Sequence, residues 1–142
     1  MIRITNYIRY NRDKWLTVQV WLWAAVFRLM LLIVPVKYVK DYYGISGEES
    51  PELESKESYG WARKIAYYVN RVSEHTPWES KCLVRALTAQ RLLTKKNITS
   101  TLYLGVKNED NKMLAHAWIR TGGYYVTGGD GSDYTTVAKF RK

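Results

Sequence analysis

The longest apolar run of the chain lies near its start, at residues 15–36. It is long enough for a membrane-spanning helix. However, Gln19 and Arg28 lie inside it, and a central arginine costs about 2.5–3.5 kcal/mol on membrane-insertion scales. The pattern therefore favours a helix buried against the rest of the protein or a partner, ended or kinked at Pro35. A helix lying on a membrane surface, with tryptophans at the interface, is the less favoured alternative.

Residues 44–58, GISGEESPELESKES, lose the apolar pattern. Glycine, serine, proline and glutamate dominate here, which is typical of a flexible linker. We therefore divide the chain into three parts: a basic apolar helical segment at 1–43, an acidic flexible linker at 44–58 and a folded domain at 59–142.

Two amphipathic helices follow the linker. Residues 59–75 carry an apolar stripe at helical spacing, and residues 82–96 carry a second one. A turn at Thr76-Pro77 separates the two helices, Ser80 is a plausible N-cap for the second, and Asn97 suits its left-handed stop position.

After Asn97 the apolar period changes from helical to alternating, which indicates strands. The expected turns are polar or glycine-rich, at 108–112, Gly122-Gly123 and 128–133. The sequence predicts an α+β fold, in which the cysteine-carrying helix precedes an antiparallel sheet with strands at 98–106, 113–121, 124–128 and 134–140.

The net charge of +9 favours an acidic partner. No motif for nucleic-acid binding accompanies the charge, so we expect no nucleic-acid partner. A single cysteine gives no disulfide framework and suits a reducing, cytoplasmic location. The two histidines lie far apart in sequence and form no zinc-ligand pattern, so we expect neither a metal nor a cofactor.

The single cysteine, Cys82, falls in the first turn of the second helix. Free backbone N–H groups and the positive end of the helix dipole face that turn and stabilise a thiolate. Lys81 and Arg85 are close in sequence. A lone cysteine in a helix is also often a small buried apolar residue, so its position alone leaves both interpretations open.

His116 lies in the strand motif AHAW, between two small alanines. A single strand histidine can be an ordinary core residue. However, a cysteine at a helix start with a histidine on a following antiparallel strand is an arrangement suited to a thiol hydrolase, in which the histidine is the base. A third group then orients the imidazole.

The stretches WESKCLVRALTAQRLL, LYLGV, AHAWIRTGG and VTGG resemble the leader peptidases of bacterial lasso-peptide gene clusters. The resemblance covers residues 59–142. It implies a papain-like core of the transglutaminase type, and it matches Cys82 to the nucleophile and His116 to the base. It also implies a substrate, the leader of a ribosomal precursor peptide, and two partners: a separate leader-binding protein and an ATP-dependent lasso cyclase.

The third catalytic residue is less clearly matched, because many relatives carry an acidic residue near the position of Gly128. A two-residue turn would place His116 opposite Gly129. Asp130 then projects to the same side as Gly128 and is the best carboxylate, although it can equally be a turn residue of GGDGSD. Thr127 is the alternative partner for the ring.

Two functions from other classes remain as alternatives. The first is a peptide-binding or scaffold protein that kept the fold and lost catalysis. The second is a membrane-surface protein that acts through its N-terminal segment. Amide transfer in place of hydrolysis is a variant of the enzyme hypothesis.

Overall fold

The computed structural model describes residues 14–33, 42–73 and 82–142. Pro35, His75, the Thr76-Pro77 turn, Ser80 and Lys81 lie outside the described residues. The elements, in chain order, are α2 (Lys14–Ile33), β1 (Ile45–Ser46), α4 (Lys56–Ser73), α5 (Cys82–Lys95), β2 (Thr101–Glu109), β3 (Lys112–Thr121), β4 (Tyr124–Thr127) and β5 (Thr135–Arg141).

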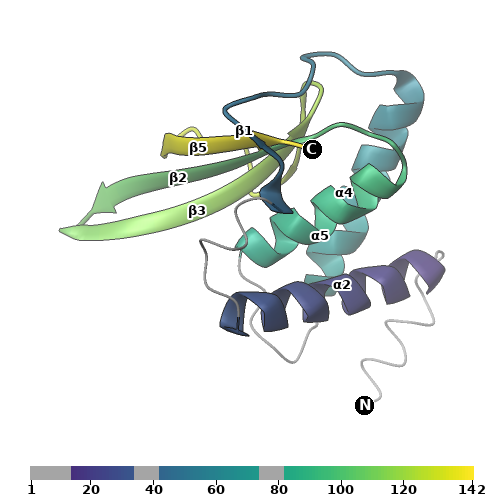
Figure 1. Cartoon of the computed structure of the whole chain (residues 1–142), viewed down its shortest axis with the longest axis horizontal. Coiled ribbons are helices and arrows are strands. Elements are labelled where there is room, and N and C mark those ends of the chain that lie inside the picture. The colour runs from purple at the N-terminus through teal and green to yellow at the C-terminus, as the bar shows by residue number, and fades with distance from the viewer. Residues whose placement is uncertain (1–13, 34–41, 74–81) are drawn as a thin grey trace.

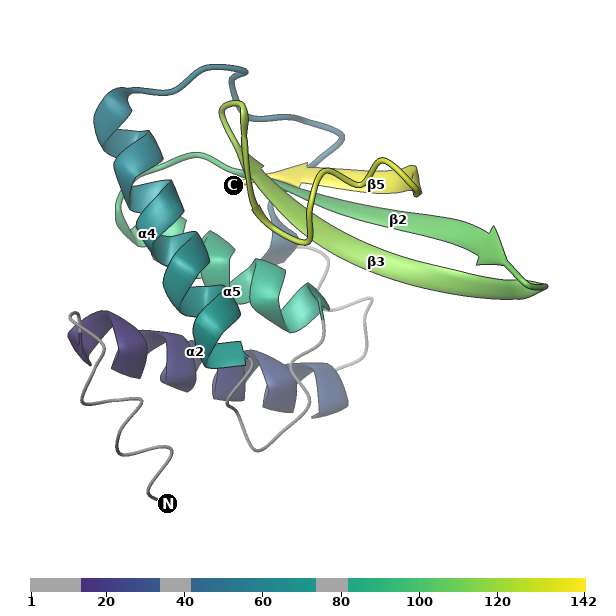
Figure 2. The same ribbon diagram turned by 180° about the vertical axis from the view of Figure 1, so that it is seen from behind.

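One five-stranded antiparallel sheet runs in the order β1-β5-β2-β3-β4. The three helices gather on one side of it, and the β2–β3 hairpin extends past them (Figure 1; Figure 2). The predicted α+β arrangement, with helices followed by an antiparallel sheet, is confirmed.

The core lies between the helices and the sheet because each element has one apolar face. On α4 the predicted stripe is buried at Ile65, Tyr68, Val69 and Val72, with Trp61 partly buried. On the sheet, Leu102, Ile119 and Phe140 come from neighbouring strands in register and are all buried. Burying a side chain of this size contributes about 1.5–3 kcal/mol, so this layer holds the helices on the sheet.

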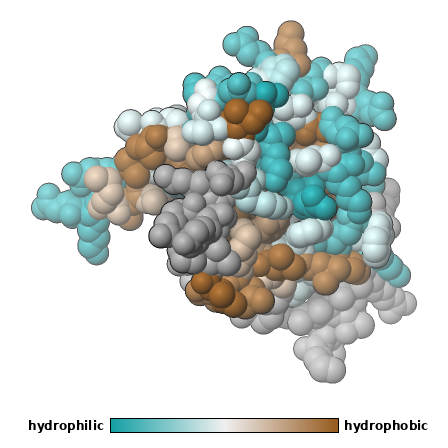
Figure 3. Space-filling model, in the orientation of Figure 1, coloured by the Kyte–Doolittle hydropathy of each residue, from teal (hydrophilic) through white to brown (hydrophobic). Residues whose placement is uncertain are grey.

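Helix α2 packs on the domain, as predicted, but with only one of its faces. Leu16, Val20, Ala24 and Phe27 are buried in the same core as α4 and α5. The opposite face stays exposed and apolar (Figure 3); its exposed large side chains are Trp15, Val18, Leu22, Val26, Leu29, Leu32 and Ile33. Among the described residues, α2 is also the one helix whose length and composition would suffice to cross a membrane, a test that core helices of soluble proteins also pass.

Helix α4 begins at Lys56, three residues earlier than the sequence pattern predicted. The reason is an N-cap: the Ser55 hydroxyl accepts a hydrogen bond from the Ser58 backbone N–H at 3.1 Å. Glu57 in the first turn also suits the positive end of the helix dipole. Residues 56–58, which the sequence pattern placed in the linker, therefore belong to the first turn of α4.

The acidic segment before α4 is hydrogen-bonded to residues of strands β2 and β3. Ser50 is buried, and its backbone N–H donates to the Thr101 hydroxyl at 2.7 Å. The guanidinium of Arg120, also buried, donates to the carbonyls of Ser50 and Pro51. Glu48 pairs with Arg141. These contacts hold the segment over the sheet face that the helices leave uncovered.

The predicted turn at Gly122-Gly123 is confirmed, since Thr121 pairs with Tyr124. One step further, the β3–β4 ladder shifts by one residue, so that Ile119 pairs with Thr127. The expectation that His116 lies opposite Gly129 assumed an unbroken register. The bulge changes that register before the ladder reaches His116.

Asn97 takes the left-handed conformation, with φ of 60°, as predicted for the stop of α5. The Ile98 backbone N–H then donates to the Leu93 carbonyl and closes the helix end. This closure is why β2 begins at Thr101 instead of Ile98.

Candidate active site

Cys82 is the first residue of α5 and is half-buried against the apolar core. Its helix packs on β3 and β4, which places the start of α5 beside the central part of the sheet (Figure 2). Arg85, one turn further on, is half-buried too. The thiol therefore occupies the helix start predicted for it, next to backbone N–H groups that the helix itself leaves without partners.

His116 lies in the middle of β3, and strand alternation decides which way its ring points. Ala117 and Ile119 face the helices and belong to the core. His116 and Trp118 therefore share the other face, where their rings stack at 5.8 Å between centroids. The Tyr134 ring packs on the imidazole at 4.8 Å. His116 thus lies in an aromatic cluster with Trp118 and Tyr134, beside the segment that follows β4.

Trp118 is the buried member of this cluster, and glycines make room for it. A Cβ on Gly131 would lie 2.3 Å from the indole, and a Cβ on Gly105 would lie 2.7 Å from it. Only glycine fits at these two positions without displacing the ring. The indole, 3% exposed, is fixed between them and supports the imidazole.

The His116 Nε2 lies 2.7 Å from the carbonyl oxygen of Gly128. A carbonyl oxygen only accepts hydrogen bonds, so Nε2 carries the hydrogen. In the neutral ring Nδ1 is then the nitrogen that can take a proton. The contact therefore orients the imidazole and selects the tautomer with a basic Nδ1.

Gly128 has to be glycine for its carbonyl to reach this position. Its φ is +78°, and a Cβ there would lie 2.5 Å from the Ala117 carbonyl oxygen. A larger residue would shift the backbone. The main chain therefore supplies an acceptor at the position where the sequence analysis noted an acidic residue in many relatives.

Asp130 and Thr127 make other contacts. The Asp130 carboxylate accepts a hydrogen bond from the Ser132 backbone N–H at 3.0 Å. This bond lowers the pKa of the Asp130 carboxyl below its usual value, so the group is ionised at neutral pH. Thr127 pairs with Ile119 and is buried on the helix side. Gly128 is the residue that contacts the His116 Nε2.

Within the described residues, no hydrogen bond joins the Cys82 thiol to the His116 ring. The thiol lies on the helix side of the sheet and the imidazole lies in the aromatic cluster on the other face. Because β3 lies between the two groups, shortening a long hydrogen bond would not bring them together. A reacting complex would need the two groups to approach each other.

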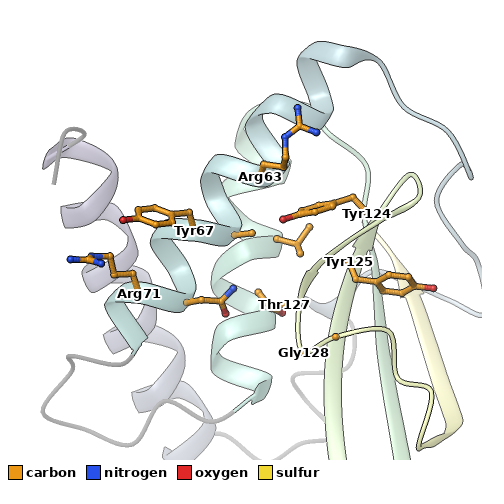
Figure 4. Close-up of a pocket in the computed structure, with 11 residues that line it drawn as sticks. Arg63, Tyr67, Arg71, Tyr124, Tyr125, Thr127 and Gly128 are labelled. Atoms are coloured by element: carbon orange, nitrogen blue, oxygen red, sulfur yellow. The ribbon is translucent and has the colours of Figure 1, made fainter.

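An open groove of about 550 Å³ lies between α4 and β4 and reaches Gly128 (Figure 4). Its helix wall includes Arg63, Tyr67 and Arg71, and its strand wall runs from Tyr124 to Gly128. Arg63, Tyr67 and Arg71 were not predicted as site residues. The signal was the polar face of the 59–75 pattern, where Arg63, Tyr67 and Arg71 recur at helical spacing opposite the buried stripe.

Residues 24–140 match a family described as the transglutaminase-like superfamily. No curated protein and no solved structure matches the chain. The matched region includes the second half of α2, all of α4 and of the cysteine-carrying helix α5, and the sheet up to the next-to-last residue of β5. The chain therefore belongs to the transglutaminase-like superfamily, which includes cysteine peptidases and transglutaminases.

Proposed function

We propose that the protein is a cysteine peptidase that removes the leader from the ribosomally made precursor of a lasso peptide. The observation that carries the proposal is a thiol in the first turn of α5, in a transglutaminase-like domain whose His116 is held as the Nε2–H tautomer. The substrate class comes from the resemblance of residues 59–142 to lasso leader peptidases.

The proposed reaction is acyl transfer followed by hydrolysis. The Cys82 sulfur attacks the carbonyl carbon of the last leader residue, and His116 takes the thiol proton at Nδ1. The imidazolium then protonates the leaving amine, the core peptide departs, and a thioester remains on Cys82. Water cleaves the thioester and frees the leader. The backbone N–H of Cys82 can stabilise the oxyanion in both steps.

The proposal includes a substrate-bound state in which the thiol and the imidazole come together. Partners are part of it as well. A separate leader-binding protein would deliver the precursor, and an ATP-dependent cyclase would take the released core peptide. A cytoplasmic location suits a free thiol nucleophile, since the compartment keeps thiols reduced.

The direct test mixes the purified full chain, the leader-binding protein and the precursor peptide, and follows the products by mass spectrometry. We expect two fragments whose masses add up to the precursor plus one water. Prior alkylation of the thiol with iodoacetamide should prevent the cleavage. An intact precursor in the presence of folded chain and partner would contradict the proposal.

The orienting role of Asp130 is tested by Asp130→Asn. We expect the cleavage rate to fall by less than about threefold, because Gly128 already holds the Nε2 and the Asp130 carboxylate is engaged by Ser132. Neutralising a carboxylate that orients a catalytic histidine costs about 10⁴ in rate. A loss of that order would assign Asp130 as the third catalytic residue. Gly128→Ala, which must shift the carbonyl, should slow the reaction more than Asp130→Asn.

A second candidate function is a peptide-binding protein with weak or no catalysis. It is favoured by Gly128, which supplies a carbonyl instead of a carboxylate, and by the separation of Cys82 from His116 in the described structure. This candidate predicts that the precursor binds and stays intact. The same mass-spectrometric experiment, combined with a binding assay, distinguishes the two functions.

A further inference from the structure

We infer that the groove between α4 and β4 binds an extended peptide segment and selects a carboxylate side chain through Arg63. One part of the inference rests on the proposed function: the bond to be cleaved is placed at the Gly128 end of the groove, which fixes the direction in which the peptide runs. Binding in the groove does not depend on whether the chain cleaves anything.

The two walls of the groove run side by side (Figure 4). Arg63 lies at the Tyr124 end of the strand wall, and Arg71 lies further along α4 with its side chain pointing away from β4 in this view. Two turns of helix separate the arginines, which is about 12 Å. An extended peptide rises about 3.3 Å per residue, so the groove accommodates a segment of about three to four residues between its two ends.

β4 is suited to receive such a segment. It is the last strand of the sheet in the described part of the chain, where one of its edges has no strand partner. An extended peptide can pair with the backbone of an edge strand while its side chains enter neighbouring pockets.

The charge of the groove decides which side chain it prefers. Among the described residues, its lining includes two arginines and no carboxylate. Arg63 is exposed to solvent, and Arg71 lies over the Tyr67 ring with its guanidinium carbon 5.9 Å from the ring centroid. Guanidinium groups bind carboxylates with two parallel hydrogen bonds. A glutamate or aspartate fits the groove better than a neutral or basic residue.

A buried polar atom in the same groove also lacks a partner. Thr127 is 2% exposed, and within the described part of the chain its hydroxyl makes no hydrogen bond. Leaving such a group unpaired costs about 1–3 kcal/mol. Because Thr127 lines the groove next to Gly128, a peptide backbone entering there can supply the missing partner.

The test measures binding to the full chain carrying Cys82→Ala, so that cleavage cannot interfere. The probes are short fluorescein-labelled peptides of serine and glycine in which one glutamate is moved along the sequence, each with its glutamine counterpart. We expect fluorescence anisotropy to show about fivefold tighter binding of the best glutamate peptide. The preference should shrink as the salt concentration is raised from about 50 mM to about 0.5 M.

Arg63→Gln should reduce the glutamate preference to less than about twofold, and Arg63→Lys should retain part of it. Lys112→Gln is the matched control, because it removes the same charge from an exposed position in the distant β2–β3 hairpin. Equal binding of glutamate and glutamine peptides would overturn the inference. So would a preference that survives Arg63→Gln, or one that Lys112→Gln removes equally well. Peptide binding without precursor cleavage would contradict the proposed peptidase and leave the groove assignment standing.

Discussion

Replacing Cys82 with alanine is expected to abolish precursor cleavage. The sulfur is the proposed nucleophile, and a methyl group cannot form the thioester. Loss of a catalytic nucleophile in hydrolases of this kind lowers the turnover rate by about a million-fold, so no product should be detectable by mass spectrometry. Normal cleavage by the alanine variant would remove Cys82 from the mechanism.

The control for Cys82→Ala is a measurement showing that the variant remains folded. Cys82 is half-buried, so trimming it to alanine should lower the free energy of unfolding by only about 1 kcal/mol, measured by urea titration. The precursor should still bind.

His116→Ala should slow cleavage by about 10²–10⁴, the usual contribution of a general base, because a thiol without a base is mostly protonated near neutral pH.

Matched variants on α4 separate the catalytic residues from the groove residues. Arg63 lines the groove and does not contact Cys82 or His116 in the structure. Arg63→Gln should therefore weaken recognition of acidic peptides while leaving the cleavage rate at saturating substrate nearly unchanged. Cys82→Ala should do the opposite. The two variants should have opposite effects on binding and on cleavage, because the groove wall lies on α4 and the thiol lies on α5.

Much of the fold could be predicted because local signals agreed with tertiary packing. The apolar stripe of α4 and the left-handed stop at Asn97 each depend on residues close in sequence. The hairpin at Gly122-Gly123 is equally local. The start of α4 was missed because Ser55 caps it from within a stretch whose composition indicated a linker.

The details of the site could not be predicted because they depend on long-range geometry. The bulge between Ile119 and Arg120 changes the partner of each residue beyond it. Alternation along β3 correctly groups His116 with Trp118, but only the sheet packing shows that Ala117 faces the helices. Likewise, the Gly128 carbonyl reaches His116 through a positive φ that the residue type permits and does not dictate.

The groove between α4 and β4 also could not be predicted from the sequence, because its two walls are distant in sequence. Arg63 and Arg71 appear only as the polar face of an amphipathic helix, which is usually exposed to solvent. Their importance arises because β4 lies beside that face. A residue pair of this kind can be recognised once two elements distant in sequence have been placed side by side.

The last prediction concerns α2. Deleting residues 1–43 should prevent the chain from folding cooperatively, because it removes a wall of the core. Val20 and Phe27 are 0% and 1% exposed. Tyr43 packs against Phe140 and accepts a hydrogen bond from Gln90 through its carbonyl. Large side chains of this kind contribute about 1.5–3 kcal/mol each, and total stabilities are only about 5–15 kcal/mol. Circular dichroism during thermal unfolding should show no sharp transition.

Two point variants separate the inner face of α2 from its outer face. Val20→Asp places a charge in the core and should destabilise the chain by several kcal/mol, whereas Val26→Asp lies at a position that is 48% exposed and should cost less than about 1 kcal/mol. Val26→Asp should also raise solubility, because it interrupts the apolar stripe.

We expect α2 to remain on the domain and not to cross a bilayer, since placing Arg28 in hydrocarbon would cost a large free energy. Cell fractionation decides between these locations: membrane association of the full chain that resists carbonate extraction would contradict the burial of α2.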